Sequence, residues 1–360
     1  MREPLWHAMS EGSVRATKRS PSSLRTTLSM LGALSLMLIA NVPLHANAAT
    51  ENSSDGYAIA SAKASSSLIL SLAHAGKRLV AVGDRGHILY SDDNGQSWTQ
   101  AKVPTQQMLT AVFFIDEKKG WAVGHDSQIL ATEDGGSTWT RQFEDLNRQA
   151  PLLDVWFQDA SHGVAVGAYG AMLETHDGGK SWEDISERVS NEDQLHLNGI
   201  TAVKDSGLLV VGESGVIFRS KDWGTTWEKV QGPYEGSLFG AVGTNQAGTV
   251  LVYGLRGHLF RSADFGEHWQ QVALPVSGDG NLEFGLSEGS LLPDGSIAVV
   301  GNGGSVLLSK DDGQTFSIFN RPDRLALSGV VAAGNGNLVL GGQGGIHLAS
   351  ATGAELTEQQ

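Results

Sequence analysis

The sequence has no cysteine, only 9 prolines and 5 tyrosines in 360 residues, and charged residues make up just 18% of it. Without cysteine there are no disulfide bonds, so the folded chain must be held by its packed core. A hydrophobic content of 40% argues against a disordered chain. What the sequence has in excess is glycine, with 46 residues, which is typical of a turn-rich protein.

A long hydrophobic run of membrane-spanning length is also missing. The apolar run at residues 28–40 is too short to cross a bilayer comfortably, and it follows four basic residues between positions 15 and 25. The small residues at 46–48 then resemble a cleavage site. We therefore expect a signal peptide over residues 1–48, cleaved after Ala48, and a periplasmic or secreted protein that does not insert into the membrane. A retained membrane anchor is the alternative, which the shortness of the run disfavours.

The charge balance is acidic, with a net charge of −14. The leader holds five basic and two acidic residues, so its removal makes the mature chain more acidic still. This argues against nucleic acid as a partner but leaves room for a local basic patch. No phosphate loop, zinc-ligand spacing or nucleophile elbow occurs, and we expect no cofactor.

One motif recurs six times, with the pattern Ser/Thr-x-Asp-x-Gly-x-x-aromatic. The first copy is "SDDNGQSW", which begins at Ser91, and the second is "TEDGGSTW", which begins at Thr132. The aromatic residues that close the copies are 41 to 47 residues apart, and a seventh repeat keeps only its first half. A period in the low forties filled with short β-type runs indicates propeller blades.

Each repeat reads as four short strands joined by hairpin-length loops. In the second repeat we predict strands at 109–114, 120–124, 128–132 and 138–142. A parallel α/β fold is excluded, because it needs crossovers of about a dozen residues or more. The sequence predicts an all-β, seven-bladed propeller of four-stranded antiparallel blades at 57–353, monomeric, after a linker at 49–56 and before a tail at 354–360. We expect residues 57–63 to supply the missing outer strand of the seventh blade, because an unpaired edge is unfavourable.

The motif itself resembles the Asp-box of sialidase-like and related propellers of the BNR class. Its aspartate can accept hydrogen bonds from the turn and from the box Ser or Thr, and its tryptophan can bury a large surface. The preceding position changes freely, from Asp92 to Glu133, His176, Lys221, Ala263 and Lys310, which is typical of a solvent-exposed position. A calcium loop would need more oxygen ligands and a distal Glu, so we expect no metal ion and no catalytic residue here. The predicted structural residues are Asp93, Asp134, Asp177, Asp222, Asp264 and Asp311, with Trp98, Trp139, Trp182, Trp227 and Trp269.

The geometry of a four-stranded meander leaves one face of the propeller for function. The turn between the third and fourth strands, which is the Asp-box, shares a face with the turn between the first and second strands. The turns between the second and third strands share the other face with the blade-to-blade connections, which vary most in length. Variable loops on a rigid scaffold are the usual place for a binding site. The predicted binding residues are Arg85, His125, Asp126, Tyr169, Glu213 and Arg256.

The sequence pattern of "GWAVGHDSQILATEDGGSTW" is similar to that of the photosystem II stability/assembly factor family of seven-bladed propellers. The resemblance implies a non-catalytic binding or assembly factor whose partner is an integral membrane protein or an envelope complex. It also implies an arginine-lined binding patch, for which Arg85, Arg219, Arg256 and Arg261 are the candidates. Cyanobacterial members are typically lipidated at a cysteine, which this sequence lacks.

The alternative is a sialidase-like glycoside hydrolase or a glycan-binding propeller. Such enzymes carry an arginine triad and an Arg-Ile-Pro motif, and the only Arg-Pro here is Arg321-Pro322. Arg85, Arg148 and Arg256 could converge, but their spacing does not require it. A test for turnover of a fluorogenic sialoside would separate the two classes.

Overall fold

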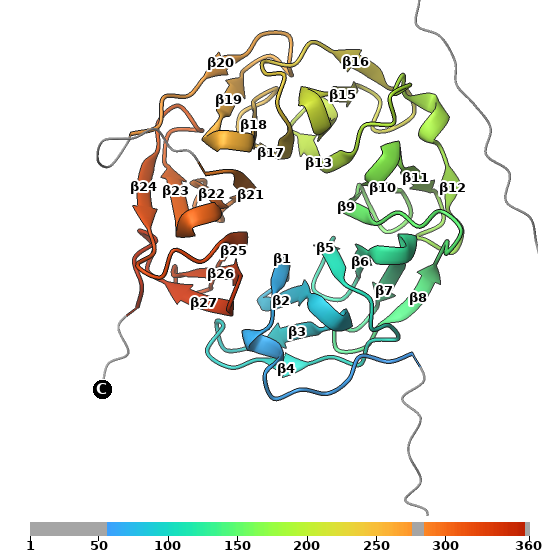
Figure 1. The fold of residues 1–360 in the computed structure, drawn as a ribbon, viewed down its shortest axis with the longest axis vertical. Helices are drawn as coiled ribbons and strands as arrows, with labels where there is room; N and C mark the ends of the chain where they lie inside the picture. The colour runs from blue at the N-terminus through green and yellow to red at the C-terminus, as the bar shows by residue number, and fades with distance from the viewer. Residues whose placement is uncertain (1–55, 276–283, 357–360) are drawn as a thin grey trace, which may run out of the picture. The chain divides into compact units, whose positions relative to one another are not determined.

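Seven antiparallel sheets surround a central channel in the computed structural model, which describes residues 56–275 and 284–356 (Figure 1). In these residues six sheets have four strands and one has three, with the first strand of each sheet innermost. The predicted seven-bladed propeller is therefore confirmed. The predicted signal peptide, nearly all of the predicted linker and the last four residues lie outside the described part of the chain.

The first four blades contain the following strands: β1 (Ile69–Ala75), β2 (Arg78–Gly83), β3 (Ile88–Ser91), β4 (Thr99–Gln100); β5 (Leu109–Phe114), β6 (Gly120–Gly124), β7 (Ile129–Thr132), β8 (Thr140–Phe143); β9 (Leu152–Phe157), β10 (Gly163–Gly167), β11 (Met172–Thr175), β12 (Glu183–Asp184); β13 (Leu197–Val203), β14 (Gly207–Gly212), β15 (Ile217–Ser220), β16 (Glu228–Val230). The last three contain β17 (Leu238–Gly243), β18 (Val250–Gly254), β19 (Leu259–Ser262), β20 (Gln270–Gln271); β21 (Leu286–Leu291), β22 (Ile297–Gly301), β23 (Ser305–Ser309), β24 (Ser317–Asn320); β25 (Leu327–Ala332), β26 (Leu338–Gly342), β27 (Gly345–Ala349).

Eight short 3₁₀ turns complete the described elements: η1 (Ala64–Ser66), η2 (Asp84–Gly86), η3 (His125–Ser127), η4 (Ala168–Gly170), η5 (Ser186–Arg188), η6 (Glu213–Gly215), η7 (Leu255–Gly257) and η8 (Asn302–Gly304). In the second repeat, β5 and β6 have the predicted bounds, and β7 and β8 begin one and two residues later than predicted. No helix in the described residues is long and apolar enough to span a membrane.

A β-bulge lies at the second residue of every inner strand, and at Thr110 and Ser328 it connects neighbouring blades. Such a bulge turns one side chain out of the pleat of its own sheet. Thr110 uses this freedom to donate from Oγ1 to the carbonyl of Leu152 in the next blade, at 2.7 Å. Ser328 donates in the same way to the carbonyl of Ile69 at 2.5 Å, which joins the seventh blade to the first.

The hydrophobic core is divided among the seven interfaces between blades. Each buried cluster takes side chains from two adjacent blades. The cluster between the seventh and first blades joins Val331 and Val339 to Ile69, Leu79 and Leu89. Because this interface is packed like the other six, the ring closes through side-chain burial.

The prediction that residues 57–63 complete the seventh blade is wrong. This segment runs along the outside of the first blade instead, where Ala58 donates its N–H to the carbonyl of Val103 at 2.9 Å. The side-chain amide of Gln100 binds this segment through two hydrogen bonds: it accepts from the N–H of Ser61 at 2.9 Å and donates to the carbonyl of Ile59 at 3.0 Å. In the described residues, the outer strand β27 of the seventh blade is flanked by η1, which packs against it, and by an isolated bridge between Ala349 and Glu355, after the chain turns back on itself.

The turns divide between the two faces as the strand order predicts. The Asp-box lies beside the turn between the first two strands, because Gly135 donates its N–H to the carbonyl of Lys118 at 2.9 Å. The turn between the second and third strands lies beside the blade connection, because Ser127 donates its N–H to the carbonyl of Ala150 at 3.1 Å. A close approach explains the glycine that ends each second strand: a Cβ on Gly124 would lie 2.2 Å from the carbonyl oxygen of Met108.

Candidate binding face

The Asp-boxes are built as structural turns. In the first box, Asp93 accepts from the Ser91 hydroxyl at 2.8 Å, from the Ser97 N–H at 2.9 Å and from the Ser97 hydroxyl at 2.5 Å. The hydroxyl of Ser91 in turn accepts from the N–H of Gly95 at 2.9 Å. These bonds, the Ser97 hydroxyl first, hold the pKa of Asp93 at about 2. The carboxylate oxygens are thus already satisfied by the turn, as expected for a structural element.

The opposite face carries the turns between the second and third strands of all seven blades, and we call it the tip face. In the first six blades these turns are 3₁₀ turns, which lie toward the viewer in Figure 1. The middle residue of each turn has a positive φ, between 53° and 78°; these residues are Arg85, Asp126, Tyr169, Ser214, Arg256, Gly303 and Gly344. Glycine adopts this left-handed backbone without strain, whereas other residues rarely do.

Five of these tips therefore carry a side chain at a position whose backbone conformation glycine would adopt with less strain. Four Asp-box residues, Asn94, Trp223, Phe265 and Asp312, share this backbone but are half-buried or buried. It is therefore the exposure of the tip side chains that makes them candidates for contact with a ligand. Tyr169 is 61% exposed, and Arg85 and Arg256 are exposed as well. Of the predicted residues, Arg85, Asp126, Tyr169 and Arg256 are middle residues of their turns.

The other two predicted residues precede the middle position. His125 is exposed, as predicted. Glu213 is only half-exposed, and its carboxylate accepts from the N–H of His196 at 3.3 Å, so it also holds its own loop in place. The six predicted residues lie on five turns, one in each of blades one to five, and do not form one compact cluster.

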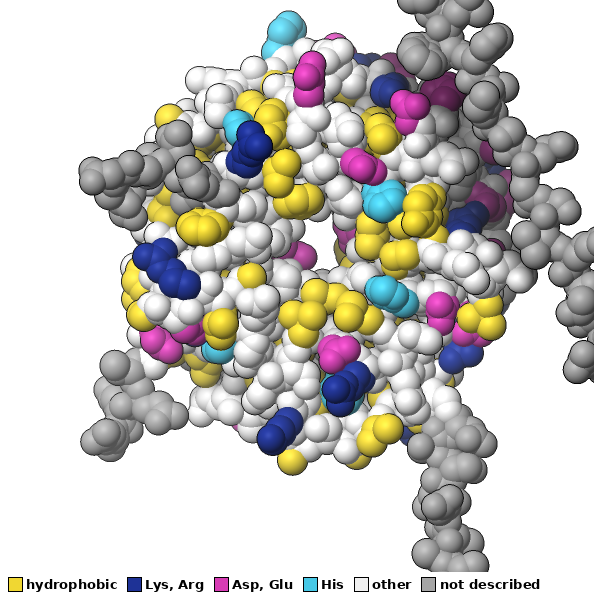
Figure 2. Space-filling view, in the orientation of Figure 1, with side chains coloured by type: hydrophobic (Ala, Val, Ile, Leu, Met, Phe, Trp, Pro, Cys, Tyr) yellow, Lys and Arg dark blue, Asp and Glu magenta, His cyan; other side chains and the backbone are white. Residues whose placement is uncertain are grey.

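Apolar side chains on the tip face were missed by the sequence analysis. Leu255 adjoins Arg256 in η7 and is 40% exposed, and Phe239 and Phe284 are also exposed near it. The Phe284 ring covers Gly303, with a ring carbon 3.0 Å from where a Cβ would lie. Figure 2 shows hydrophobic side chains around the central opening and only scattered basic ones on this face. These phenylalanines belong to connections and strand starts, where periodicity does not separate exposed from buried residues.

A cleft of about 640 Å³ lies beside Tyr169. Its lining also includes Arg148, Asp184 and Gln194. Arg148 is paired with Asp184, and Tyr169 packs edge-on against His196 with ring centroids 4.9 Å apart. Arg85 and Arg256, from the first and fifth blades, do not line this cleft, so it does not assemble an arginine triad.

Two of the four arginines proposed for a binding patch serve a different purpose. Arg219 is buried and donates to the carbonyl of Phe265 at 2.8 Å and to Glu228 and Glu267 at 2.6 Å each. Arg261 donates to the carbonyl of Asp312 at 2.8 Å. Each arginine precedes the serine of its own Asp-box and reaches the Asp-box of the next blade. They therefore connect blades on the opposite face, which leaves Arg85 and Arg256 on the tip face.

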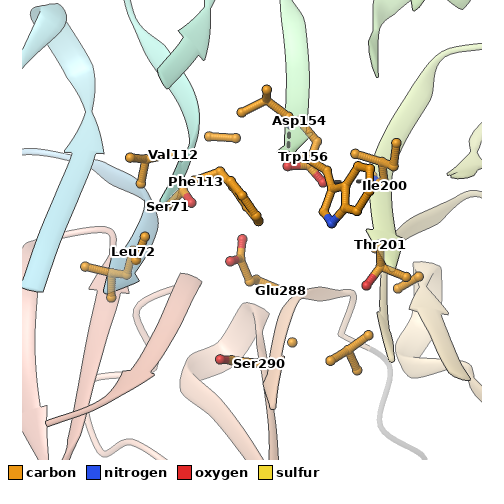
Figure 3. A pocket seen from close by; sticks show the side chains of 18 of the residues that line it. Ser71, Leu72, Val112, Phe113, Asp154, Trp156, Ile200, Thr201, Glu288 and Ser290 are labelled. Atoms are coloured by element: carbon orange, nitrogen blue, oxygen red, sulfur yellow. Dashed lines mark hydrogen bonds between the residues drawn. The ribbon is translucent and has the colours of Figure 1, made fainter. Parts of the chain in front are cut away.

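The central channel encloses about 800 Å³ between the inner strands of the blades. Glu288 of β21 points into this space, with Phe113 and Asp154 on its other side (Figure 3). Asp154 accepts from the N–H groups of Val155 at 2.8 Å and Ile200 at 2.9 Å, which ties the third blade to the fourth. Burial raises the pKa of Asp154 to about 6, against the lowering effect of these bonds.

Burial, and then the charge of Asp154, raises the pKa of Glu288 well above its ordinary value. The nearby Tyr253 hydroxyl has a raised pKa for the same two kinds of reason, burial first and then the charges of Glu288 and Asp154. Burial in the channel therefore disfavours negative charge on these three side chains. It is a poor site for a second anion.

Comparison with known proteins agrees with this architecture. A family model described as photosynthesis system II assembly factor YCF48 matches residues 96–149 and 140–280, and a BNR/Asp-box repeat model matches residues 89–100. The fold and its boxes thus define a seven-bladed propeller of the BNR/Asp-box class. Within that class, the chain belongs to the YCF48 photosystem II assembly factor-like family.

Solved structures show the same fold in proteins of low sequence identity. One is described as YCF48 bound to D1 peptide, with 20% identity, coverage of 80% of this chain and 93% of that one, and a TM-score of 0.62. YCF48 from Cyanidioschyzon merolae has 16% identity, coverage of 79% and 96%, and a TM-score of 0.62. The GH74 xyloglucanase from Xanthomonas campestris has 12% identity, coverage of 82% and 54%, and a TM-score of 0.61. A search of curated protein sequences finds no significant match.

Proposed function

We propose that this protein is a non-catalytic binding and assembly factor that holds a segment of a membrane protein on its tip face. The observation that carries the proposal is the set of exposed side chains at left-handed tip positions, on a ring that is closed by seven packed interfaces. Such a ring presents side chains in a nearly fixed arrangement, which reduces the entropy lost on binding.

The chemistry of the tip face suits a protein segment. Arginine and tyrosine, which recur among binding hot spots, occur at the tips as Arg85, Tyr169 and Arg256. Apolar anchors lie beside them, at Leu255 and Phe284. The relative described as bound to D1 peptide supports a peptide as the ligand of this family. For this chain the partner is a membrane protein exposed on the outer side of the membrane, if residues 1–48 act as the export signal.

Binding to detergent-solubilised membrane proteins from the native host tests the proposal. The untagged chain is compared with the double variant Arg85→Ala/Arg256→Ala, with Tyr169→Ala, and with the control Lys118→Ala. Lys118 is exposed and lies on the Asp-box face. We expect one membrane protein to be retained by wild type and the control and to be lost, by about tenfold or more per hot-spot residue, in the tip variants. Equal retention by all four proteins would contradict the tip face as the binding surface.

The proposal also predicts no glycosidase activity. Hydrolysis of glycosides generally requires two carboxyl groups free to serve as acid and nucleophile or base. In the channel, Asp154 is instead bonded to two backbone N–H groups. Turnover of a fluorogenic sialoside that is abolished by Arg256→Ala would overturn the non-catalytic assignment.

A further inference from the structure

Two histidines and a buried glutamate meet on the Asp-box side of the third blade. His162 directly precedes β10, Glu174 lies in β11, and His176 follows that strand at the start of the Asp-box. One side-chain nitrogen or oxygen of each residue lies within 4.8 Å of the others. From this geometry we infer a binding site for one divalent transition-metal ion of the zinc type, held by His162, Glu174 and His176.

The spacing of His162 and Glu174 suits a tetrahedral ion. His162 Nε2 lies 3.1 Å from Glu174 Oε1, while His176 Nε2 lies 3.4 Å from the other carboxylate oxygen, so the exposed His176 side chain has to shift toward Oε1 to complete the site. With metal–ligand bonds of about 2.0 Å, neighbouring ligand atoms of a tetrahedral site are about 3.3 Å apart. The two imidazole rings stack with centroids 4.8 Å apart, so both present the same edge toward the carboxylate.

Groups around the three ligands would orient them. His162 Nδ1 lies 3.0 Å from the side-chain amide oxygen Oε1 of Gln158, which can only accept a hydrogen bond. Donation from Nδ1 leaves the Nε2 lone pair of a neutral ring directed at Glu174, where a cation would relieve the contact between two acceptors. Histidines that bind metals are commonly oriented by such a second hydrogen bond.

The glutamate is arranged to bind through one oxygen. Its side chain is 2% exposed, and Arg188 donates to its Oε2 at 2.7 Å. Oε1 then remains for the ion, and the arginine offsets the cost of burying the carboxylate charge. Imidazole and carboxylate together suit zinc and its neighbours in the first transition row.

The site also has an entrance from solvent. His162 is 15% exposed, whereas His176 is 68% exposed and opens the cluster to solvent. Gly224 of the next Asp-box forms the remaining wall, because a Cβ there would lie 3.6 Å from Glu174 Oε1 and from His162 Cε1. Three protein ligands leave a fourth tetrahedral position for water.

No metal ion is predicted from the sequence, because the repeated box alone lacks the ligands for one. His176 stands at the box position that varies between repeats, and Glu174 stands where Arg219 and Arg261 stand in later blades. The site is therefore a property of the third blade alone, and it is independent of the binding function proposed for the tip face.

The test is a zinc titration of the untagged full chain after removal of metal by a chelator, followed by cobalt substitution. We expect one high-affinity equivalent of Zn²⁺, and Co²⁺ absorption bands typical of tetrahedral coordination. His176→Ala, which changes an exposed side chain, should weaken zinc binding by about 100-fold or more. Gln158→Ala should weaken it by about tenfold, since it removes only the orienting bond.

The matched control is His268→Ala, which removes an exposed histidine from the Asp-box of the fifth blade. It should bind zinc as wild type does. Circular dichroism checks that each variant is folded. Weak binding by wild type, or equal binding by wild type and His176→Ala, would overturn the inference.

Discussion

The guanidinium of Arg219 in the fourth blade donates to the carboxylate of Glu267 in the Asp-box of the fifth blade, at 2.6 Å. The same side chain donates to the carbonyl of Phe265 at 2.8 Å in a buried contact. Arg219→Ala leaves these acceptors unpaired, and we expect it to lower the free energy of unfolding by about 2 kcal/mol. Chemical denaturation of Arg219→Ala beside Lys229→Ala, an exposed neighbour on β16, measures the difference. Retention of the membrane partner should be unchanged, and a loss of binding without a loss of stability would restore Arg219 to the binding patch.

The tryptophans of the Asp-boxes differ in burial, and so should the cost of removing them. Trp139 is 3% exposed, packs edge-on against Phe114 and donates from Nε1 to the carbonyl of Gly136 at 3.0 Å. Trp139→Ala should lower the free energy of unfolding by about 3–5 kcal/mol. Trp98 makes the equivalent hydrogen bond but is only half-buried, so Trp98→Ala should cost less. Equal costs in a denaturation series would contradict this reading of the boxes.

Acid should unfold the propeller through its Asp-boxes. The pKa values of Asp93, Asp177 and Asp311 are lowered to about 2, in each case chiefly by the hydroxyl at the fourth position after the aspartate. A carboxyl group with a lowered folded-state pKa stabilises the protein above the unfolded value near 3.8, and this contribution is lost as the pH falls toward 2. We expect the melting temperature to fall steeply between about pH 4 and pH 2. A flat melting temperature over this interval would argue against the hydrogen-bonded boxes.

The carboxyl group of Glu288 in the channel changes stability with pH in the opposite direction. The pKa of Glu288 is raised in the folded state above its unfolded-state value of about 4.5. The contribution of this side chain to stability is therefore full below about pH 4.5 and is lost as the pH rises from there toward the folded-state pKa. Glu288→Gln keeps the shape and removes the charge, and it should raise the melting temperature at pH 7 but not at pH 4. Asp154→Asn is the comparison, because it also disturbs two hydrogen bonds from backbone N–H groups and should be destabilising. A lower melting temperature of Glu288→Gln at pH 7 would contradict the assigned burial.

Much of the fold could be predicted because the Asp-box repeats. The box sets the register of each blade, and from the register follow the strands of the second repeat and the division of turns between faces. Contacts between blades could not be predicted in the same way. The position of Arg219 in its own repeat gives no sign that its side chain reaches the box of the next blade.

Features that do not recur from blade to blade also could not be predicted from the Asp-box repeat. Residues 57–63 alternate as an edge strand would, yet Gln100 and Val103 of the first blade bind their backbone. Glu174 and the histidines on either side of it come together because β10 and β11 are paired, with Val164 opposite Glu174. Spacing alone did not distinguish them from a solvated strand end.

Attachment of a photo-reactive amino acid to the tip face in living cells tests the central claim most directly. The residue replaces Tyr169 at a left-handed tip or, as the control, Lys118 on the Asp-box face, and the cross-linked products are identified by mass spectrometry. We predict that position 169 captures a membrane protein through one defined segment and that position 118 does not. Capture of that protein from position 118 alone, or of no protein from position 169, would contradict the account.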